Sequence, residues 1–169
     1  MQSAIAHRRI SALAAAATLT VLMHPALSGN AAANRAHVRS DGVVTVASRF
    51  PMAETVSRLK ADIAAKGITF FAEIDQQALA RSAGIELPPS TLLVFGNPAL
   101  GSHFITANAQ AGLDWPVRLL VSGNRNGKVS LSYTNFDWIA RRHAITTRGK
   151  EFATASKVIA SIADSVRAK

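Results

Sequence analysis

The strongest constraint on the fold is a change in hydrophobic spacing at Gly67. After Gly67, apolar and polar residues alternate over residues 68–75, which is typical of a half-buried strand. Gly67 is free to take the left-handed backbone that ends many helices. Before it, apolar residues recur at the spacing of one helical face that begins after Pro51: Met52, Val56, Leu59 and Ile63. The sequence therefore predicts a helix and a strand joined at Gly67.

The same reading gives short strands and helices along the whole of residues 43–169. We expect strands at 43–49, 68–75, 91–95, 117–122 and 128–133, the last two joined by a hairpin loop at 123–127. We expect helices at 51–66, 76–83, 98–108 and 136–142, and a C-terminal amphipathic helix with Phe152, Ala155, Ile159, Ile162 and Val166 on one face. This order predicts the α+β fold class: a single two-layer domain with helices packed on a mostly antiparallel sheet.

Three finer expectations concern which side chains are covered. The apolar run 91–95 is expected to be covered on both faces of the sheet. Phe70 is expected to share a face with Ile68, Ala72 and Ile74, because these residues alternate along one strand. The helix at 98–108 is expected to bury Leu100, Phe104 and Ala107.

The first 33 residues have the pattern of a secretory signal peptide. Arg8 and Arg9 precede an uncharged apolar run at 10–23, and small residues at 31–33 offer a cleavage site, with a cut after Ser28 as the alternative. The run is shorter than the about 20 residues that a membrane span needs. We therefore predict cleavage, export by the general secretory route, and a periplasmic or secreted protein with no retained membrane span. Residues 34–42 are polar and are expected to be a flexible segment.

The charge balance limits the partners of the exported chain. The net charge is +9, and loss of Arg8 and Arg9 lowers it to about +7. A basic surface steers anions toward the protein, and export makes an anionic small ligand or envelope component a better partner than nucleic acid. The chain has no cysteine, which excludes disulfides and thiol chemistry. No histidine pair has metal-ligand spacing, so we predict no metal site and no cofactor.

One candidate for chemistry is a pair of carboxylates. Glu73 and Asp75 lie two apart on one predicted strand, so they point to the same face about 7 Å apart. Such a pair can perform acid–base catalysis if one pKa is raised, with His143 as a third group in a shared cleft. It can also bind a hard cation, with Asn97 or a carbonyl adding oxygens. The simpler interpretation is that Glu73 is solvated and Asp75 caps the helix that follows it.

Two further features point to anion binding. Gly96 and Asn97 come just after a predicted strand and open a helix at Pro98, where backbone N–H groups can hold an anion; the alternative is a turn that needs these residues only for its shape. His143 lies within the densest basic stretch, residues 141–150. The alternative there is that His143 hydrogen-bonds a carboxylate such as Asp114.

Several stretches resemble one known family. The matching segments are 54–59, 67–75, 86–98 with its Phe-Gly-Asn-Pro ending, and 113–116 with Leu-Asp-Trp-Pro; Tyr133, Arg142 and His143 also fit. Over roughly residues 51–143 the chain resembles the DUF302 (TT1751-like) domains of bacteria and archaea. The resemblance implies a compact two-layer α+β fold similar to the TATA-binding-protein-like folds, often found as a dimer, and it implies no reaction. Gln76 departs from the family pattern, which often has histidine after Asp75, and His103 stands where a smaller or apolar residue is expected.

These observations favour a non-enzymatic module that binds a small ligand or a partner. The candidate ligand-binding residues are Gly96, Asn97, His103, Asp114, Tyr133, Arg142 and His143. The alternatives are an enzyme that uses Glu73, Asp75 and His143 as acid–base groups, or a dimeric assembly partner. The dimer contact would be the C-terminal stripe 152–166, provided that it is exposed.

Overall fold

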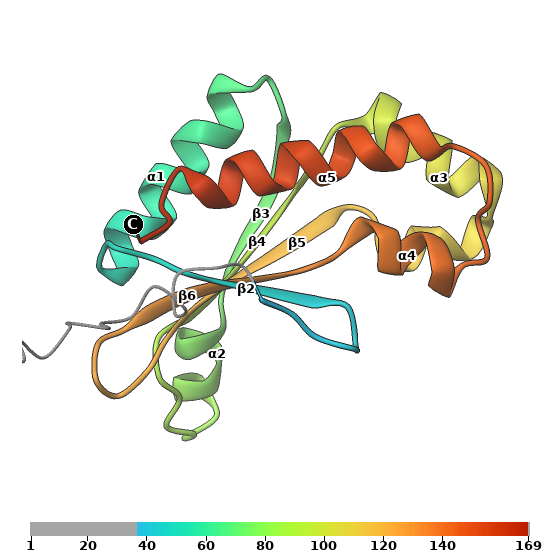
Figure 1. The fold of residues 1–169 in the computed structure, drawn as a ribbon. Coiled ribbons are helices and arrows are strands. Elements are labelled where there is room, and N and C mark those ends of the chain that lie inside the picture. The colour runs from blue at the N-terminus through green and yellow to red at the C-terminus, as the bar shows by residue number, and fades with distance from the viewer. Residues whose placement is uncertain (1–36, 169) are drawn as a thin grey trace, which may run out of the picture.

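The computed structural model of the chain describes residues 37–168, and the predicted signal peptide lies outside the described residues. Its strands form one antiparallel sheet in the order β1-β2-β6-β5-β4-β3. The strands are β1 (His37–Val38), β2 (Val43–Ala47), β3 (Thr69–Asp75), β4 (Ser90–Gly96), β5 (Val117–Gly123) and β6 (Val129–Thr134). The helices are α1 (Met52–Ala65), α2 (Gln76–Ser82), α3 (Pro98–Ala107), the short 3-10 helix η1 (Ala109–Leu113), α4 (Phe136–Arg142) and α5 (Gly149–Asp164). The predicted α+β fold class is confirmed (Figure 1).

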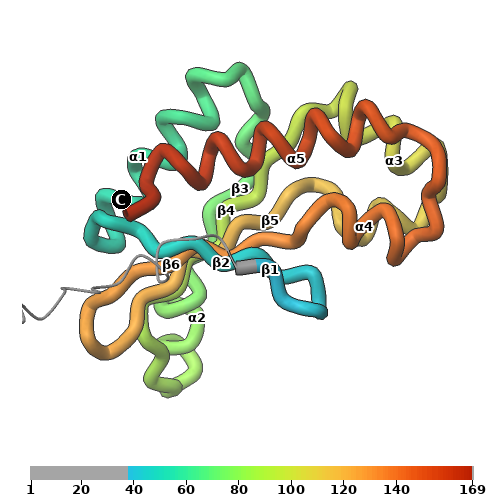
Figure 2. The backbone as a smooth tube through the Cα atoms, in the orientation of Figure 1, coloured from blue at the N-terminus to red at the C-terminus, as the bar shows by residue number. Residues whose placement is uncertain are grey.

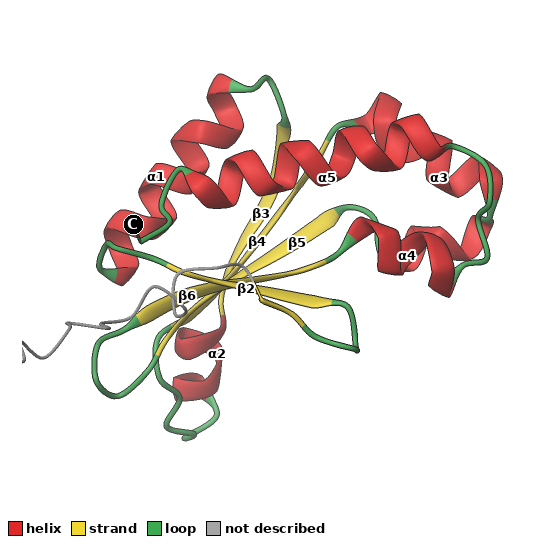
Figure 3. Ribbon diagram, in the orientation of Figure 1, coloured by secondary structure: helices red, strands yellow, loops and turns green. Residues whose placement is uncertain are grey.

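The helices α1, α3, α4 and α5 lie together on one face of the sheet (Figure 3). The helix α2, which connects β3 to β4, lies apart from them. Side chains therefore alternate in burial along each central strand. Those facing the helices are buried, for example Leu93, Leu119 and Leu131 at 0 % exposed. Their neighbours on the second face, such as Leu92 and Leu120, are half-buried. The expectation that the strand at 91–95 is covered on both faces was wrong, because the apolar run does not reveal how many layers cover it.

A bulge changes the orientation of β3, the edge strand. Phe70 pairs with Phe95 and Ala72 pairs with Val94, so the register shifts between Phe70 and Ala72. Directly opposed residues share a face of the sheet. Phe70 therefore lies on the helix side and not on the face of Ala72 and Ile74, which corrects the expected alternation. The extra residue of a bulge leaves no mark in a period-two pattern.

The predicted α1 is confirmed, with Pro51 before its first residue and Gly67 after its end at φ +65°. Leu59 and Ile63 are fully buried. Thr55 is also fully buried, and its hydroxyl lies 2.8 Å from the Ser48 hydroxyl. The buried hydroxyl of Thr55 thus finds its hydrogen-bond partner in the turn that precedes the helix.

The helix α5 crosses the whole helix layer, from the α3–α4 end of the molecule to α1 (Figure 2). Its predicted stripe is core: Phe152, Ala155, Ile159, Ile162 and Val166 are all buried within the chain. The condition for a dimer contact at this stripe is therefore not met.

The chain after α5 returns to β2. The Arg49 N–H donates to the Val166 carbonyl at 3.0 Å, and the Ala168 N–H donates to the Ala47 carbonyl at 3.0 Å. These bonds continue the sheet edge where β1 pairs with β2.

Three local expectations differ from the structure. The segment 34–42 was expected to be flexible, but its described part contains β1 and a turn that pair with β2. The helix η1 was not predicted. Ala107 is exposed, and α3 instead buries Gly101 together with Phe104.

Among the described residues, no helix has the length and apolar character needed to cross a membrane.

Candidate functional site

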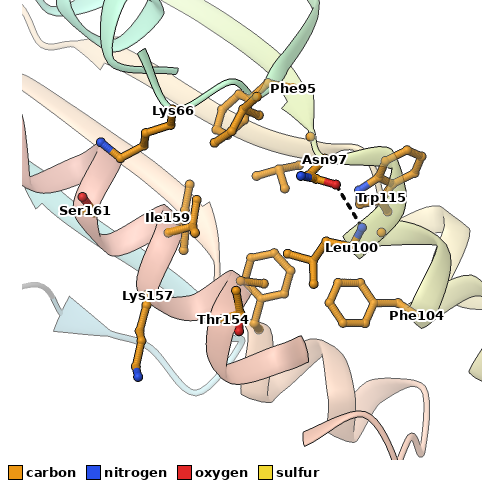
Figure 4. Close-up of a pocket in the computed structure, with 17 residues that line it drawn as sticks. Lys66, Phe95, Asn97, Leu100, Phe104, Trp115, Thr154, Lys157, Ile159 and Ser161 are labelled. Atoms are coloured by element: carbon orange, nitrogen blue, oxygen red, sulfur yellow. Dashed lines mark hydrogen bonds between the residues drawn. The ribbon is translucent and has the colours of Figure 1, made fainter. Parts of the chain in front are cut away.

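An open pocket of about 440 Å³ lies between α5, α3 and the adjoining ends of β4 and β5 (Figure 4). Most of its wall is apolar. The aromatic members are Phe95, Phe104, Trp115 and Phe136, and the aliphatic members are Ile68, Leu100, Val117, Ala155, Val158 and Ile159. A pocket of this volume and character is in the range that holds a small organic molecule.

The turn between β4 and α3 forms one side of the pocket. The Asn97 side-chain oxygen accepts a hydrogen bond from the Leu100 N–H at 3.0 Å and so caps α3, while Pro98 occupies the first turn. The predicted helix start is confirmed. The first turn of α3 that follows this cap places Leu100 and Gly101 at the pocket wall.

Trp115 packs against Gly96 at the end of β4 and Gly101 within α3. A Cβ atom added to Gly101 would lie 2.1 Å from the Trp115 indole, and one added to Gly96 would lie 3.0 Å from it. Trp115 also contacts Phe71 edge-on, with the ring centroids 6.1 Å apart. Only glycine allows the indole this close to the backbone of α3, so the two glycines fix the position of the wall.

Packed phenylalanines support the deep end of the pocket. Phe104 lies between Phe136 and Phe152, at centroid distances of 5.9 Å and 4.3 Å. The three rings come from α3, α4 and α5, so the pocket exists only when these helices pack together. Contacts among aromatic rings add to the stability gained by burying them.

The polar residues lie at the rim. Lys66 follows α1, and its ammonium lies 2.6 and 2.7 Å from the two carboxylate oxygens of Asp62. Lys157, Thr154 and Ser161 come from α5. In the described part of the chain, no carboxylate pairs with Lys157, and no aspartate or glutamate lines the pocket.

The structure separates the predicted ligand-binding residues. Gly96 and Asn97 line the pocket. His103 is exposed on α3 and is not a lining residue. Tyr133 lies on β6, in the core beneath the helices, where burial raises the pKa of its hydroxyl.

The remaining three candidates come together elsewhere, around the buried carboxylate of Asp114. His143 Nε2 lies 2.7 Å from Asp114 Oδ2, which confirms the predicted hydrogen bond between His143 and a carboxylate. Arg142 Nη1 donates to both carboxylate oxygens at 3.0 and 3.1 Å. Arg118 lies 3.5 Å away. Asn108 donates to the His143 carbonyl at 2.9 Å. This cluster ties the end of α4 to the segment before β5, and in it the buried carboxylate of Asp114 is paired within the chain.

The two acid–base candidates on β3 have separate partners. The Asp75 carboxylate accepts from the Ala78 N–H at 2.9 Å, so the predicted cap of α2 is confirmed. Glu73 pairs with Lys60 of α1 at 2.5 Å. Neither is a partner of His143, and Figure 1 places α2, which Asp75 caps, well away from α4, which His143 follows. The structure does not assemble the three side chains into one site.

Sequence reasoning missed most of the pocket because its walls come from elements that are far apart in the chain. The available signal was Trp115 together with the glycines at 96 and 101, since a large ring needs a small residue opposite it. Among the described residues, no cluster of three or more histidine or acidic side chains is suited to a metal ion.

Comparisons with known proteins agree with the fold. The model of the family described as "Domain of unknown function DUF302" matches residues 44–166. A crystal structure of an uncharacterized conserved DUF302 protein from Bacillus stearothermophilus superposes with a TM-score of 0.68 and 20 % identity, covering 75 % of this chain and 98 % of that one. At that identity the likeness supports the fold alone.

Curated relatives are named as fluoride-specific ion channels. The Fluoride-specific ion channel FluC 1 of Brucella suis biovar 1 is 38 % identical over 110 residues, which are 65 % of this chain and 43 % of the relative. The protein of the same name from Brucella abortus biovar 1 gives 38 % identity over 110 residues and 41 % of its length. The chain thus spans less than half the length of the curated relatives it matches.

Proposed function

Since the chain belongs to the DUF302 family, for which no function is defined, we propose from its site that it is a non-enzymatic binding protein that holds an apolar small molecule in the pocket between α3 and α5. The observation that carries this proposal is the pocket itself. A protein core normally closes upon its own apolar side chains, whereas here Leu100, Trp115 and Val158 remain only half-buried around an open space of about 440 Å³.

The side chains around the pocket favour binding over catalysis. Its titratable lining groups within the described chain are Lys66 and Lys157, both at the rim. The Asp62 carboxylate contacts Lys66 but does not line the pocket. Among the described residues, no histidine or carboxylate lines the pocket to form the nucleophile–base or acid–base pair that catalysis needs. A pocket with an apolar interior and a few polar groups at its edge fits reversible capture of a ligand.

We place this activity outside the cytoplasm. The support is the order of basic, apolar and small residues over 1–33. Expression of the full chain in a Gram-negative host checks this: the periplasmic fraction should hold a product whose intact mass lacks residues 1–33 or 1–28. A full-length product confined to the cytoplasm would contradict it.

The pocket is tested with N-phenyl-1-naphthylamine, a neutral apolar dye that fluoresces in apolar surroundings. The chain should bind one molecule of dye saturably. Thr154→Phe places a large ring at the pocket wall and should weaken binding at least tenfold. Ala153→Phe, at the neighbouring exposed position of α5 but outside the lining, should leave binding unchanged. Absence of saturable binding, or equal binding by the two variants, would overturn the proposal.

A second candidate function follows from the curated relatives: an accessory module for a membrane channel. A pore must cross a membrane by helices or a closed barrel, and the described part of this chain has no helix able to do so. The shared region is less than half of each relative, so we infer that it assists the pore.

The test is fluoride efflux from proteoliposomes that contain the Brucella suis relative without the shared region. Added chain should change the efflux rate and sediment with the vesicles; no change in either measurement excludes this role.

A further inference from the structure

The polar side chains of the pocket gather on one side. Figure 4 shows Lys66, Lys157 and Ser161 on the side of the pocket opposite Trp115 and Phe104. A ligand in the pocket therefore meets an aromatic wall at one end and lies beside Lys66, Lys157 and Ser161 at the other, where the two ammonium groups point outward (Figure 4). Such a division selects the orientation of a molecule with one polar end.

The charge of the polar side is positive. Asp62 compensates Lys66, since both of its oxygens contact that ammonium. Lys157 is exposed and has no ion-pair partner in the described part of the chain. On the same side of α5, Lys150, Thr154, Lys157 and Ser161 follow one another at spacings of three or four residues, a row that contains no acid. One unbalanced positive charge therefore lies at the rim, on a lysine side chain whose ammonium points outward in Figure 4 and whose exposed stem is free to turn toward a bound anion.

We propose that the ligand is an amphipathic anion: a single apolar body that lies against the aromatic wall and one anionic group that pairs with Lys157 and Lys66. This inference rests on the proposed function and adds the charge and orientation of the ligand to it. Ser161 lines the same rim, and its hydroxyl can donate a hydrogen bond to a carboxylate, sulfonate or phosphate group. The Thr154 hydroxyl, also at the rim, donates to the Lys150 carbonyl at 2.9 Å. The anionic end remains near solvent, so its charge is not buried in an apolar interior.

Two dyes with one skeleton test the charge directly. 8-Anilino-1-naphthalenesulfonate carries a sulfonate that N-phenyl-1-naphthylamine lacks. The wild-type chain should bind the sulfonate more tightly than the neutral dye, and the sulfonate should displace the neutral dye. Added salt should weaken only the sulfonate, because screening acts on the charge pair.

Variants assign the effect to the rim. Lys157→Met keeps the apolar stem and should weaken sulfonate binding about three- to tenfold, the range of a partly exposed ion pair strengthened by hydrogen bonds. The double variant with Lys66→Met should weaken it further, and neither should change binding of the neutral dye. Lys150→Met, on α5 but outside the pocket lining, is the matched control.

A variant that binds the sulfonate more tightly than the wild type cannot owe this effect to misfolding. Asp62→Asn frees Lys66 from its carboxylate and should tighten sulfonate binding about two- to fivefold with the neutral dye unchanged. If the lysine variants weaken both dyes equally, or neither, the anionic ligand is excluded while the pocket stands. If the neutral dye fails to bind the wild-type chain, the proposed function itself fails.

Discussion

Ala144 and Arg148, in the short segment between α4 and α5, adopt a left-handed backbone although they are not glycine, at φ +50° and +65°. Ala144 directly follows the cap of α4. The Ile145 N–H donates to the Ala140 carbonyl at 2.9 Å, which is the bond that closes a helix after a left-handed residue. A side chain in this conformation costs about 1–2 kcal/mol.

Replacement of Ala144 by glycine should therefore stabilise the protein. We expect Ala144→Gly to raise the free energy of unfolding by about 0.5–1 kcal/mol, because relief of the strain exceeds the entropy lost by glycine. Urea denaturation measures the change. Ala153→Gly, at an exposed helical position of α5, is the control and should lower stability by about 1 kcal/mol. A loss of similar size in both variants would show that Ala144 is not strained.

Tyr133 is the single tyrosine of the chain, so its ionisation can be followed alone. Burial raises the pKa of its hydroxyl above the ordinary value of 10.0, Arg167 lowers that pKa and Asp164 raises it. In the unfolded chain the hydroxyl loses its proton near pH 10, while in the folded chain it keeps it. Stability contributed by the neutral hydroxyl is thus complete below pH 10 and is lost as the pH rises through the folded pKa.

The measurement is absorbance at 295 nm against pH. The folded chain should titrate at higher pH than the chain in urea. Tyr133→Phe should show a smaller fall in unfolding free energy between pH 9 and pH 11.5 than the wild type. Coincident titration curves in the folded and unfolded states would contradict the effect of burial.

At the scale of the element, the position of α3 depends on its contact with Trp115. A methyl group at residue 101 would lie 2.1 Å from the indole, so either the ring or the helix must move. We expect Gly101→Ala to lower the free energy of unfolding by about 1–3 kcal/mol and to weaken dye binding in the pocket. Gly112→Ala, where the added Cβ has open space, is the control. Equal stability of the two variants in thermal denaturation would refute the close packing of α3.

Elements with strong local signals were predictable. The Asn97-Pro98 start of α3, the range of α4 and the Gly67 end of α1 all follow from turn chemistry within a few residues. Elements whose form depends on distant neighbours were not. The bulge in β3 is a shift in its register with β4, and β1 is a strand only through its antiparallel pairing with β2. Two residues of extended chain carry no pattern of their own.

At the scale of the whole molecule, the site was only partly predictable. Gly96 and Asn97 were found because they are neighbours in the chain. The rest of the pocket joins Lys66, Trp115 and the side of α5, which only the packing of helices on the sheet brings together. The motif residues Asp114, Arg142 and His143 also meet, but as an internal clamp. These three side chains stabilise the packing of α4 against the segment before β5, whereas the pocket is lined mostly by apolar residues.

The pairing of the C-terminal residues with β2 has a consequence for how such a domain is joined to other polypeptides. His37 pairs with Thr45, and the Ala168 N–H bonds to the Ala47 carbonyl, so both ends of the described chain meet one strand two residues apart. This whole unit can therefore be inserted into a single surface loop of a host protein. The two host residues that flank the insertion would remain close together. Transplanting residues 37–168 into a loop of an unrelated carrier should leave both proteins folded.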